Sequence, residues 1–312
     1  MTRALRVATR ASALARWQAE RVVELLDRPA ELVVVSTRGD RDTASTIHTL
    51  GGTGVFVKEV QNAVLRGDAD LAVHSAKDLP PRAPEGLVLA AVPERGDPRD
   101  ALVGSTLADL PTGARIGTGS VRRRAQLAAL RPDLTFGELR GNIPTRLERA
   151  AEFDAVVIAA AALDRLGLAA RATERLDPST LLPQVAQGAL AIECRADDAD
   201  TLAALAEIDD ATAHAEVRAE RAFLDQLGGG CTLPCGALAR TTKRVATGNE
   251  VGMISLDVLL ASLDGRIVLR AQGRGTDPEA LGLEVARRLL DEQGGRAILD
   301  LPGELGVEKV RK

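Results

Sequence analysis

The sequence has few aromatic residues and no excess of positive charge. Aromatic residues make up 2% of its 312 residues, with no tyrosine and one tryptophan, and the formal net charge is −4. Proteins that bind nucleic acid usually stack bases on aromatic rings or present a strongly basic surface. We therefore expect no nucleic-acid partner, and any anion site must be built from local clusters of arginine.

Cysteine and histidine are also scarce, with three of each. An odd, small number of cysteines in a chain of this length is not a disulfide framework and fits a reducing compartment. Cys231 and Cys235 lack a Cys/His pair to complete four ligands, so we expect no metal site. The N-terminus lacks the apolar core of a signal peptide, and the longest apolar run, 155–163, is too short to span a membrane. We expect a cytoplasmic protein with no membrane partner.

The chain contains two successive alternations of strand and helix patterns, which predict α/β domains with parallel sheets. The first has strand-like runs at 5–9, 31–37, 70–74 and 87–92, and helical patterns at 13–26 and 57–66. The second has strand-like runs at 114–117, 134–139 and 155–161, and helical patterns at 121–130 and after Asn142. A stretch rich in charge, glycine and proline, 94–100, predicts a crossing between the two domains.

The pattern changes after these alternations. Two helical patterns, 198–207 and 213–227, precede extended segments at 253–260 and 266–271 and a helix at 277–290, which predicts a smaller α+β domain. The length fits two or three domains. We place domain 1 at 1–94 and 188–210, domain 2 at 95–187, and domain 3 at 211–312.

A glycine-rich loop from Gly228 to Gly236 carries Cys231 between a helical pattern and an extended segment. Glycines allow close backbone approach and leave open space beside the thiol, which would make it accessible. Buried cysteines and glycines that merely cap a helix are equally common. The local sequence alone leaves both interpretations open.

Polar side chains recur where the expected strands end. They are Arg10 and Ser12; Ser75, Lys77 and Asp78; Ser120, Arg122 and Arg123; Arg140 and Arg146; and Arg165. In open α/β sheets, ligands bind beyond the carboxyl ends of the strands. One such arginine could be a solvated surface charge, but their repetition predicts a ligand with several carboxylates or phosphates. Asp78, alone among cations, is suited to stabilise a transient positive charge or move a proton, or it is a structural partner of Lys77.

Five motifs together resemble the porphobilinogen deaminase, or hydroxymethylbilane synthase, family. They are VATRAS at 7–12, VHSAKD at 73–78, GTGSVRR at 117–123, LRGN at 139–142 and GGC at 229–231. The resemblance runs in order from about residue 5 to residue 240 and is weaker beyond. It implies two lobes like those of type II periplasmic binding proteins, followed by a smaller α+β domain that carries the cofactor cysteine.

The resemblance also implies a reaction. The cofactor is a dipyrromethane, joined to Cys231 through a thioether. Porphobilinogen loses ammonia to give an azafulvene-like electrophile, four substrate molecules are joined head to tail on the cofactor, and water releases hydroxymethylbilane for tetrapyrrole biosynthesis. Each pyrrole carries an acetate and a propionate, so the growing chain is a polyanion. The resemblance implies a monomer whose only partners are these small molecules.

The family's functional residues map onto this sequence residue by residue. The implied catalytic residues are Asp78, Lys77 and Ser75; the implied cofactor-binding residues are Cys231, Ser120, Arg122, Arg123, Asp78 and Lys77. The implied substrate-binding residues are Arg10, Ser12, Phe56, Arg140, Arg146, Arg165, Gln187 and Gly188. The sequence departs from the family at Thr53, often lysine; Gly119, commonly serine; Ala186, usually glycine; and Cys235, usually apolar, which we expect to be buried and inert.

Two other functions are compatible with parts of the sequence. A non-catalytic, two-lobed anion-binding protein would also carry arginines at its strand ends, but it does not require Asp78 or an accessible thiol. A cysteine hydrolase would need a histidine near Cys231 as a base. His214 lies about 17 residues earlier, roughly 25 Å away along a continuous helix, which makes this the weakest alternative.

Overall fold

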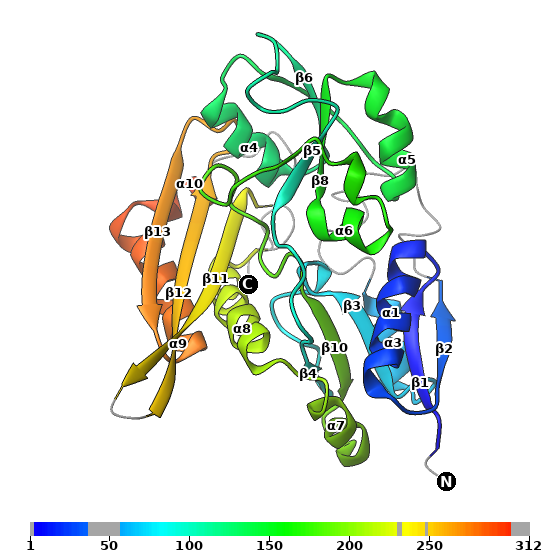
Figure 1. The fold of residues 1–312 in the computed structure, drawn as a ribbon. Helices are drawn as coiled ribbons and strands as arrows, with labels where there is room; N and C mark the ends of the chain where they lie inside the picture. The colour runs from blue at the N-terminus through cyan, green and yellow to red at the C-terminus, as the bar shows by residue number, and fades with distance from the viewer. Residues whose placement is uncertain (1–2, 37–56, 230–232, 247–248, 301–312) are drawn as a thin grey trace.

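The computed structural model describes residues 3–36, 57–229, 233–246 and 249–300, which form three sheets. Figure 1 shows them as three groups: a first lobe in blue and cyan, a second lobe in green, and a third unit whose strands run from yellow to orange. Strand β10 and helix α7, late in the sequence, return to the first lobe.

The sheet of the first lobe has the strand order β2-β1-β3-β10-β4. Its strands are β1 (Leu5–Arg10), β2 (Ala30–Val35), β3 (Leu71–Ser75), β4 (Leu87–Ala91) and β10 (Leu190–Arg195). Its helices are α1 (Ala13–Leu26), α3 (Lys58–Leu65) and α7 (Ala199–Ala206). Strand β1 runs parallel to β2 and β3, whereas β10 is antiparallel to both β3 and β4.

The sheet of the second lobe has the order β7-β6-β8-β5-β9. Its strands are β5 (Asp100–Val103), β6 (Arg115–Gly117), β7 (Thr135–Gly137), β8 (Ala155–Ala159) and β9 (Glu174–Arg175). Its helices are α4 (Val121–Leu130), α5 (Ile143–Glu148) and α6 (Ala160–Arg165). Strand β6 runs parallel to β7 and β8, and β5 is antiparallel to β8 and β9.

The two lobes share one topology. In each sheet, the strand that follows the crossing from the other lobe, β10 or β5, is inserted antiparallel beside the third strand of the lobe's own series. This repetition confirms the expected pair of like α/β lobes. It corrects the expectation of parallel sheets, because strand–helix alternation does not reveal strands that arrive from another lobe.

Two elements of the second lobe differ from the sequence prediction. Strand β5 lies where the sequence pattern predicted the end of a crossing, because its four buried residues follow directly on a charged, proline-containing segment. The expected strand 155–161 ends at Ala159, and helix α6 begins at Ala160. Both halves of that apolar run are buried, so hydrophobic periodicity could not distinguish strand from helix.

The third unit is an antiparallel sheet of β11 (Cys235–Ala246), β12 (Asn249–Ala261) and β13 (Val268–Gly275). Helices α8 (Ala211–Gln226) and α9 (Pro278–Arg287) pack on one face, followed by a wider turn, Arg288–Glu292, and α10 (Gly295–Asp300). Side chains alternate along β11: Ala237 and Ala239 join the core with α8, whereas Leu238 packs with Ala125 of the second lobe. The predicted α+β character of this unit is confirmed.

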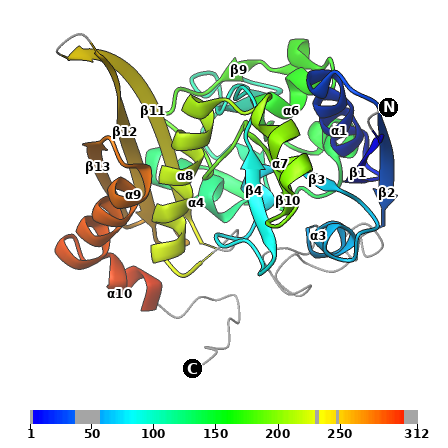
Figure 2. The ribbon, with the colours of Figure 1, turned by 90° about the horizontal axis from the view of Figure 1, so that it is seen from below.

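Helix α8 lies between the third sheet and the first lobe in both ribbon views (Figures 1 and 2). The proposed boundaries place β10 with domain 1 and β5 to β9 with domain 2, which are the sheets in which these strands lie. The boundaries themselves stay a prediction.

Candidate active site

Strand β3 ends in a 3₁₀ turn, Ala76–Asp78, that carries the predicted catalytic residues. Backbone N–H of Ala76 donates to the carbonyl of Ala189, and Gln18 of α1 donates to the Ser75 hydroxyl at 2.8 Å. The Asp78 carboxylate is half-buried and has no hydrogen bond or ion pair with any residue that the structure describes. The turn is thus held by its backbone and by Ser75, which leaves the acid of Asp78 available to a ligand.

The Lys77 ammonium lies at the junction of the two lobes. It donates to Gln187 Oε1 at 3.2 Å, and the Gln187 amide donates in turn to Asp100 of β5 at 3.0 Å. Burial, and then the positive charge of Arg123, lower the pKa of Lys77 to about 8, although the charges of Asp78 and Asp100 act in the opposite direction. The negative charges near Lys77 therefore do not offset its burial and the positive charge of Arg123.

Asp100 is a buried carboxylate that the sequence analysis missed, and it binds two of the predicted cofactor arginines. Arg122 Nη2 and Arg123 Nη2 each lie 2.7 Å from its oxygens. Burial alone would raise the pKa of Asp100, but these two charges and hydrogen bonds from Arg123 and Gln187 hold it well below its usual range. The signal in the sequence was an aspartate at the start of an apolar run, which looked like the end of a charged crossing.

Arg122 and Arg123 consequently lie in the interior, with exposed fractions of 3% and 6%. Arg122 also donates to the carbonyl of Leu182, and Arg123 to that of Val157. Arg122 Nε is buried with no hydrogen-bond partner among the described residues. Two guanidiniums share one carboxylate here, so the cluster keeps a net positive charge. Their role as direct cofactor ligands stays a prediction.

Arg140 precedes α5, and Arg146 lies within it. Asn142 caps this helix by accepting from Thr145 N–H, and Arg146 Nε donates to the carbonyl of Gly141 at 2.8 Å. Burial, and then the charge of Arg123, lower the pKa of Arg146 to about 10, with Asp78 opposing the shift and Arg140 adding to it. Because Arg146 experiences the charges of both Asp78 and Arg123, these groups from the two lobes belong to one electrostatic cluster.

Arg165 at the end of α6 contacts the first lobe. Its Nη2 donates to the carbonyl of Gly188 at 2.6 Å, and its guanidinium lies 5.7 Å from the ring centroid of Trp17 on α1. Burial lowers its pKa to about 10. Gly188 has φ +88°, and a Cβ there would lie 2.4 Å from the carbonyl oxygen of Gly96, so only glycine fits at this crossing.

Ser12 and Ser120 are helix N-caps, one in each lobe. Ser12 Oγ accepts from Ala15 N–H in α1, and Ser120 Oγ accepts from Arg123 N–H in α4. Arg10, at the end of β1, is half-buried, and its side chain or backbone already interacts with another residue. An N-terminus of a helix favours an anion, so both serines remain candidates for ligand contacts through the backbone around them.

Several predicted residues lie outside the described residues: Cys231, Phe56 and the family departure Thr53. Cys235 is 5% exposed, which confirms that it is buried, and Cys194 of β10 is buried as well. Burial raises the pKa of the Cys194 thiol to about 11. Ala186, the departure at a position usually glycine, has φ +58°, in the left-handed region that glycine adopts without strain.

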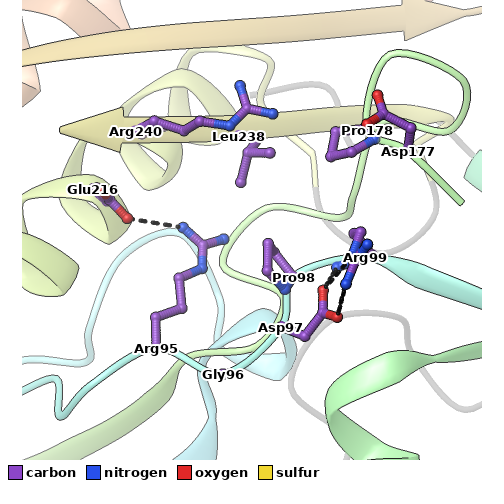
Figure 3. Close-up of a pocket in the computed structure, with 11 residues that line it drawn as sticks. Arg95, Gly96, Asp97, Pro98, Arg99, Asp177, Pro178, Glu216, Leu238 and Arg240 are labelled. Atoms are coloured by element: carbon purple, nitrogen blue, oxygen red, sulfur yellow. Dashed lines mark hydrogen bonds and ion pairs between the residues drawn. The ribbon is translucent and has the colours of Figure 1, made fainter. Parts of the chain in front are cut away.

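A cavity of about 470 Å³ lies elsewhere, at the crossing between the lobes (Figure 3). Its walls come from the crossing segment, the second lobe and the third unit, and include Arg95, Arg99, Asp177, Glu216 and Arg240. Figure 3 shows Arg95 directed at Glu216 and Arg99 paired with Asp97. None of the predicted site residues lines this cavity. Its charged groups already have ion-pair or hydrogen-bond partners, so the Lys77–Asp78 cluster is the stronger candidate for the active site.

Two further properties concern the described part of the chain. No group of three or more His, Cys, Asp or Glu side chains there could hold a metal ion. None of its helices has the length and apolar composition needed to cross a membrane.

Comparison with known proteins decides the family. A model described as "Porphobilinogen deaminase, dipyromethane cofactor binding domain" matches residues 5–203, and one described as "Porphobilinogen deaminase, C-terminal domain" matches residues 214–291. The chain belongs to the porphobilinogen deaminase family. The porphobilinogen deaminase of Roseiflexus sp. strain RS-1 is 47% identical over 310 residues, covering 96% of this chain and 99% of the relative. That of Brevibacillus brevis is 44% identical over 306 residues, covering 95% and 97%.

Solved structures give weaker similarities. A periplasmic binding protein of Salmonella typhimurium with high arginine specificity aligns with a TM-score of 0.38 and 15% identity, covering 66% of this chain and 92% of that one. A TRAP periplasmic solute binding protein from Ralstonia eutropha has a TM-score of 0.40 and 12% identity, covering 67% and 77%. TM-scores this low add nothing to the fold, which the strand order establishes.

Membership in the porphobilinogen deaminase family confirms the function expected from the motifs. The protein is a transferase of tetrapyrrole biosynthesis that acts on porphobilinogen and uses a dipyrromethane cofactor. The alternative of a non-catalytic anion-binding protein is thereby set aside. Which residues carry out the reaction is a separate question, because the comparisons assign no role to individual side chains.

Proposed function

We propose that porphobilinogen is deaminated and polymerised at the cluster of Lys77, Asp78, Arg123 and Arg146 between the two lobes, on a dipyrromethane held by Cys231 through a thioether. The observation that carries this proposal is the crowding of cations there. Lys77 and Arg146 both have pKa values lowered by burial and by the charge of Arg123, to about 8 and about 10. A polyanion would relieve that repulsion.

The cofactor fits these residues chemically. A dipyrromethane bears four carboxylates, and the cluster offers Lys77 and Arg146 as cations near Asp78, with Arg140 close to Arg146. When bound, it supplies the pyrrole carbon to which the first substrate is joined. Ser120 and the N-terminus of α4 would bind one carboxylate by backbone N–H groups. Arg122 and Arg123 would act through their charge, since Asp100 holds their guanidiniums in the interior.

Asp78 has the catalytic role in this proposal. Its unpaired carboxylate can accept the N–H of a pyrrole and stabilise the positive charge that develops as ammonia leaves. Lys77 beside it, with a pKa of about 8, can bind a substrate carboxylate and hold it in place. Arg10, Ser12, Arg165, Gln187, Gly188 and Phe56 would bind the acetates and propionates or border the incoming ring.

The test is Asp78→Asn, which keeps the shape of the side chain and removes its charge. We expect the variant to keep the cofactor mass and to lose kcat by a factor of about 10² to 10⁴, the range typical of a group that acts on a developing charge or a proton. Asp68→Asn, at an exposed ion pair with Arg66, is the control and should retain full turnover. Near-normal activity of Asp78→Asn would remove this residue from the mechanism.

We further propose that the enzyme is a cytoplasmic monomer. The support for the compartment is that Cys194 and Cys235 are both buried and that the sequence has three cysteines in all, a small and odd number that does not fit a disulfide framework. Light scattering of the purified enzyme at working concentration tests the monomer, and a mass twice that of the chain would contradict it.

A further inference from the structure

The apolar residues of the catalytic turn pack against the third unit. Ala76 and Leu79, which flank Lys77 and Asp78, are 2% and 3% exposed and belong to the core that contains Val217 and Phe223 of α8. The core of the first lobe, built around Val7 and Leu71, is a separate cluster. The turn therefore belongs by sequence to the first lobe, but its apolar side chains join the core that contains α8 of the third unit.

Helix α8 also holds the segment that follows the turn. Arg221 Nη2 donates to the carbonyl of Pro81 at 2.9 Å, and Arg82 binds both carboxylate oxygens of Asp225 at 2.8 and 2.9 Å. Arg221 and Asp225 are four residues apart, so they lie on one face of α8. The Arg221 contact is the more sheltered of the two, since Arg82 is 82% exposed and its ion pair is screened by solvent.

The backbone between Pro81 and Asp78 is stiff. Leu79 is extended, with φ −69° and ψ 143°, as a residue before proline must be. Pro80 and Pro81 each have φ fixed by the ring. Because few backbone dihedral angles between these residues can change, a shift of the Pro81 carbonyl should also move Asp78.

We propose that Arg221 is a positioning residue. It fixes the catalytic turn to α8 and so keeps the Asp78 carboxylate aligned with the pyrrole rings of the primer. The chain runs only five residues from Gln226, the last residue of α8, to Cys231. The same helix thus holds the catalytic turn by its side chains and leads directly to the attachment point. This inference rests on the proposed attachment of the cofactor at Cys231.

The arrangement has a consequence for chain growth. The two-ring primer is the shortest chain that has to reach Asp78, whereas a longer chain has more flexible methylene bridges through which it can adjust. A loosened catalytic turn should therefore slow the first addition most and the later additions less. A loss of folded enzyme would instead slow every addition by the same factor.

The test is Arg221→Met, which keeps the apolar stem and removes the donor. The control is Arg218→Met on the same helix, whose exposed guanidinium pairs with Glu279 of α9 rather than with the first lobe. We expect Arg221→Met to carry the cofactor mass, to lose kcat about tenfold with KM within about twofold, and to be partly rescued in Arg221→Lys. Arg218→Met should match the wild type.

Intact mass after brief mixing with four equivalents of porphobilinogen gives the second readout. We expect wild type to show protein with one, two and three added pyrrole units, and Arg221→Met to remain largely at zero. If the Met variant does not fold, Arg221→Gln, which retains a shorter donor, is compared in its place and should show the same selective delay.

The result that overturns the inference is wild-type kcat in Arg221→Met, or an equal slowing at every chain length. Failure of the proposed function looks different: wild-type enzyme would then lack the cofactor mass, or Cys231→Ala would retain it. The chain lengths and the cofactor mass are read from the same spectra, and kcat comes from a separate turnover assay.

Discussion

Replacement of Asp100 by asparagine should destabilise the second lobe severely. Its carboxylate is fully buried and binds Arg122 at 2.7 Å, Arg123 at 2.7 and 3.0 Å, and Gln187 at 3.0 Å. Asparagine fits the same space but leaves two interior guanidiniums with no counter-charge and points an N–H₂ donor at other donors. Breaking a buried ion pair by removing one partner costs about 3–5 kcal/mol.

This cost can be followed by the thermal midpoint. For a domain of 60–100 residues, such as the second lobe at 95–187, 1 kcal/mol shifts Tm by about 4–8 °C, so Asp100→Asn should lower the Tm of that lobe by roughly 12–40 °C. The matched control is Asp133→Asn. Its carboxylate also lies 2.7 Å from a guanidinium, that of Arg131, but the two side chains are 29% and 27% exposed. Because solvent screens that pair, its loss should change the Tm of the same lobe by no more than about 8 °C.

Differential scanning calorimetry of the two variants, under the same buffer and salt, measures both Tm values. Because the N–O distances in the two ion pairs are equal, a difference in Tm shift cannot come from distance. Equal shifts in Tm for Asp100→Asn and Asp133→Asn would refute the argument, since Asp100 is buried and neutralises two interior guanidiniums, whereas Asp133 is partly exposed and pairs with one. A normal Tm for Asp100→Asn would mean that Arg122 and Arg123 have another counter-ion.

Three other predictions follow from single residues. Ala186→Gly should raise the free energy of unfolding by about 0.5–1 kcal/mol in chemical denaturation, because glycine relieves the left-handed backbone at φ +58°, and a loss of stability would contradict this. In cofactor-free protein, the pKa of Lys77 is lowered from 10.5 to about 8, so its charge disfavours folding below pH 8 and this penalty disappears as the pH rises to 10.5. Stability relative to Lys77→Met should therefore increase across that interval, and a flat difference would show that the ammonium is not desolvated. Trp17, the only tryptophan in the sequence, should change its fluorescence when porphobilinogen displaces Arg165 from its ring, and Arg165→Met should abolish the change.

Helix positions were the most predictable part of the fold. Helices α1 and α4 have the bounds expected from the sequence, because each begins at a serine cap and then shows an amphipathic pattern. Strand β5 was not predicted, since its four buried residues follow charge and proline and carry no alternation. The antiparallel insertion of β5 and β10 was also hidden, because it depends on which lobe the chain enters next.

The site was predictable as a set of residue types but not as a network. Arg122 and Arg123 were expected to bind the cofactor in an arginine-lined cleft, which stays a prediction; the sequence did not reveal that both pair with Asp100, which is 22 and 23 residues away in the chain. Gln187 was expected to contact substrate, and its amide joins Lys77 to Asp100. Such pairings depend on the meeting of two lobes, which a local pattern does not encode.

The central claim is that a dipyrromethane is attached at Cys231, and intact mass spectrometry of the purified enzyme tests it most directly. The wild-type mass should exceed the sequence mass by two pyrrole units. Cys235→Ala should keep this excess and Cys231→Ala should lose it. A bare sequence mass from active enzyme, or an adduct that persists in Cys231→Ala, would contradict the claim.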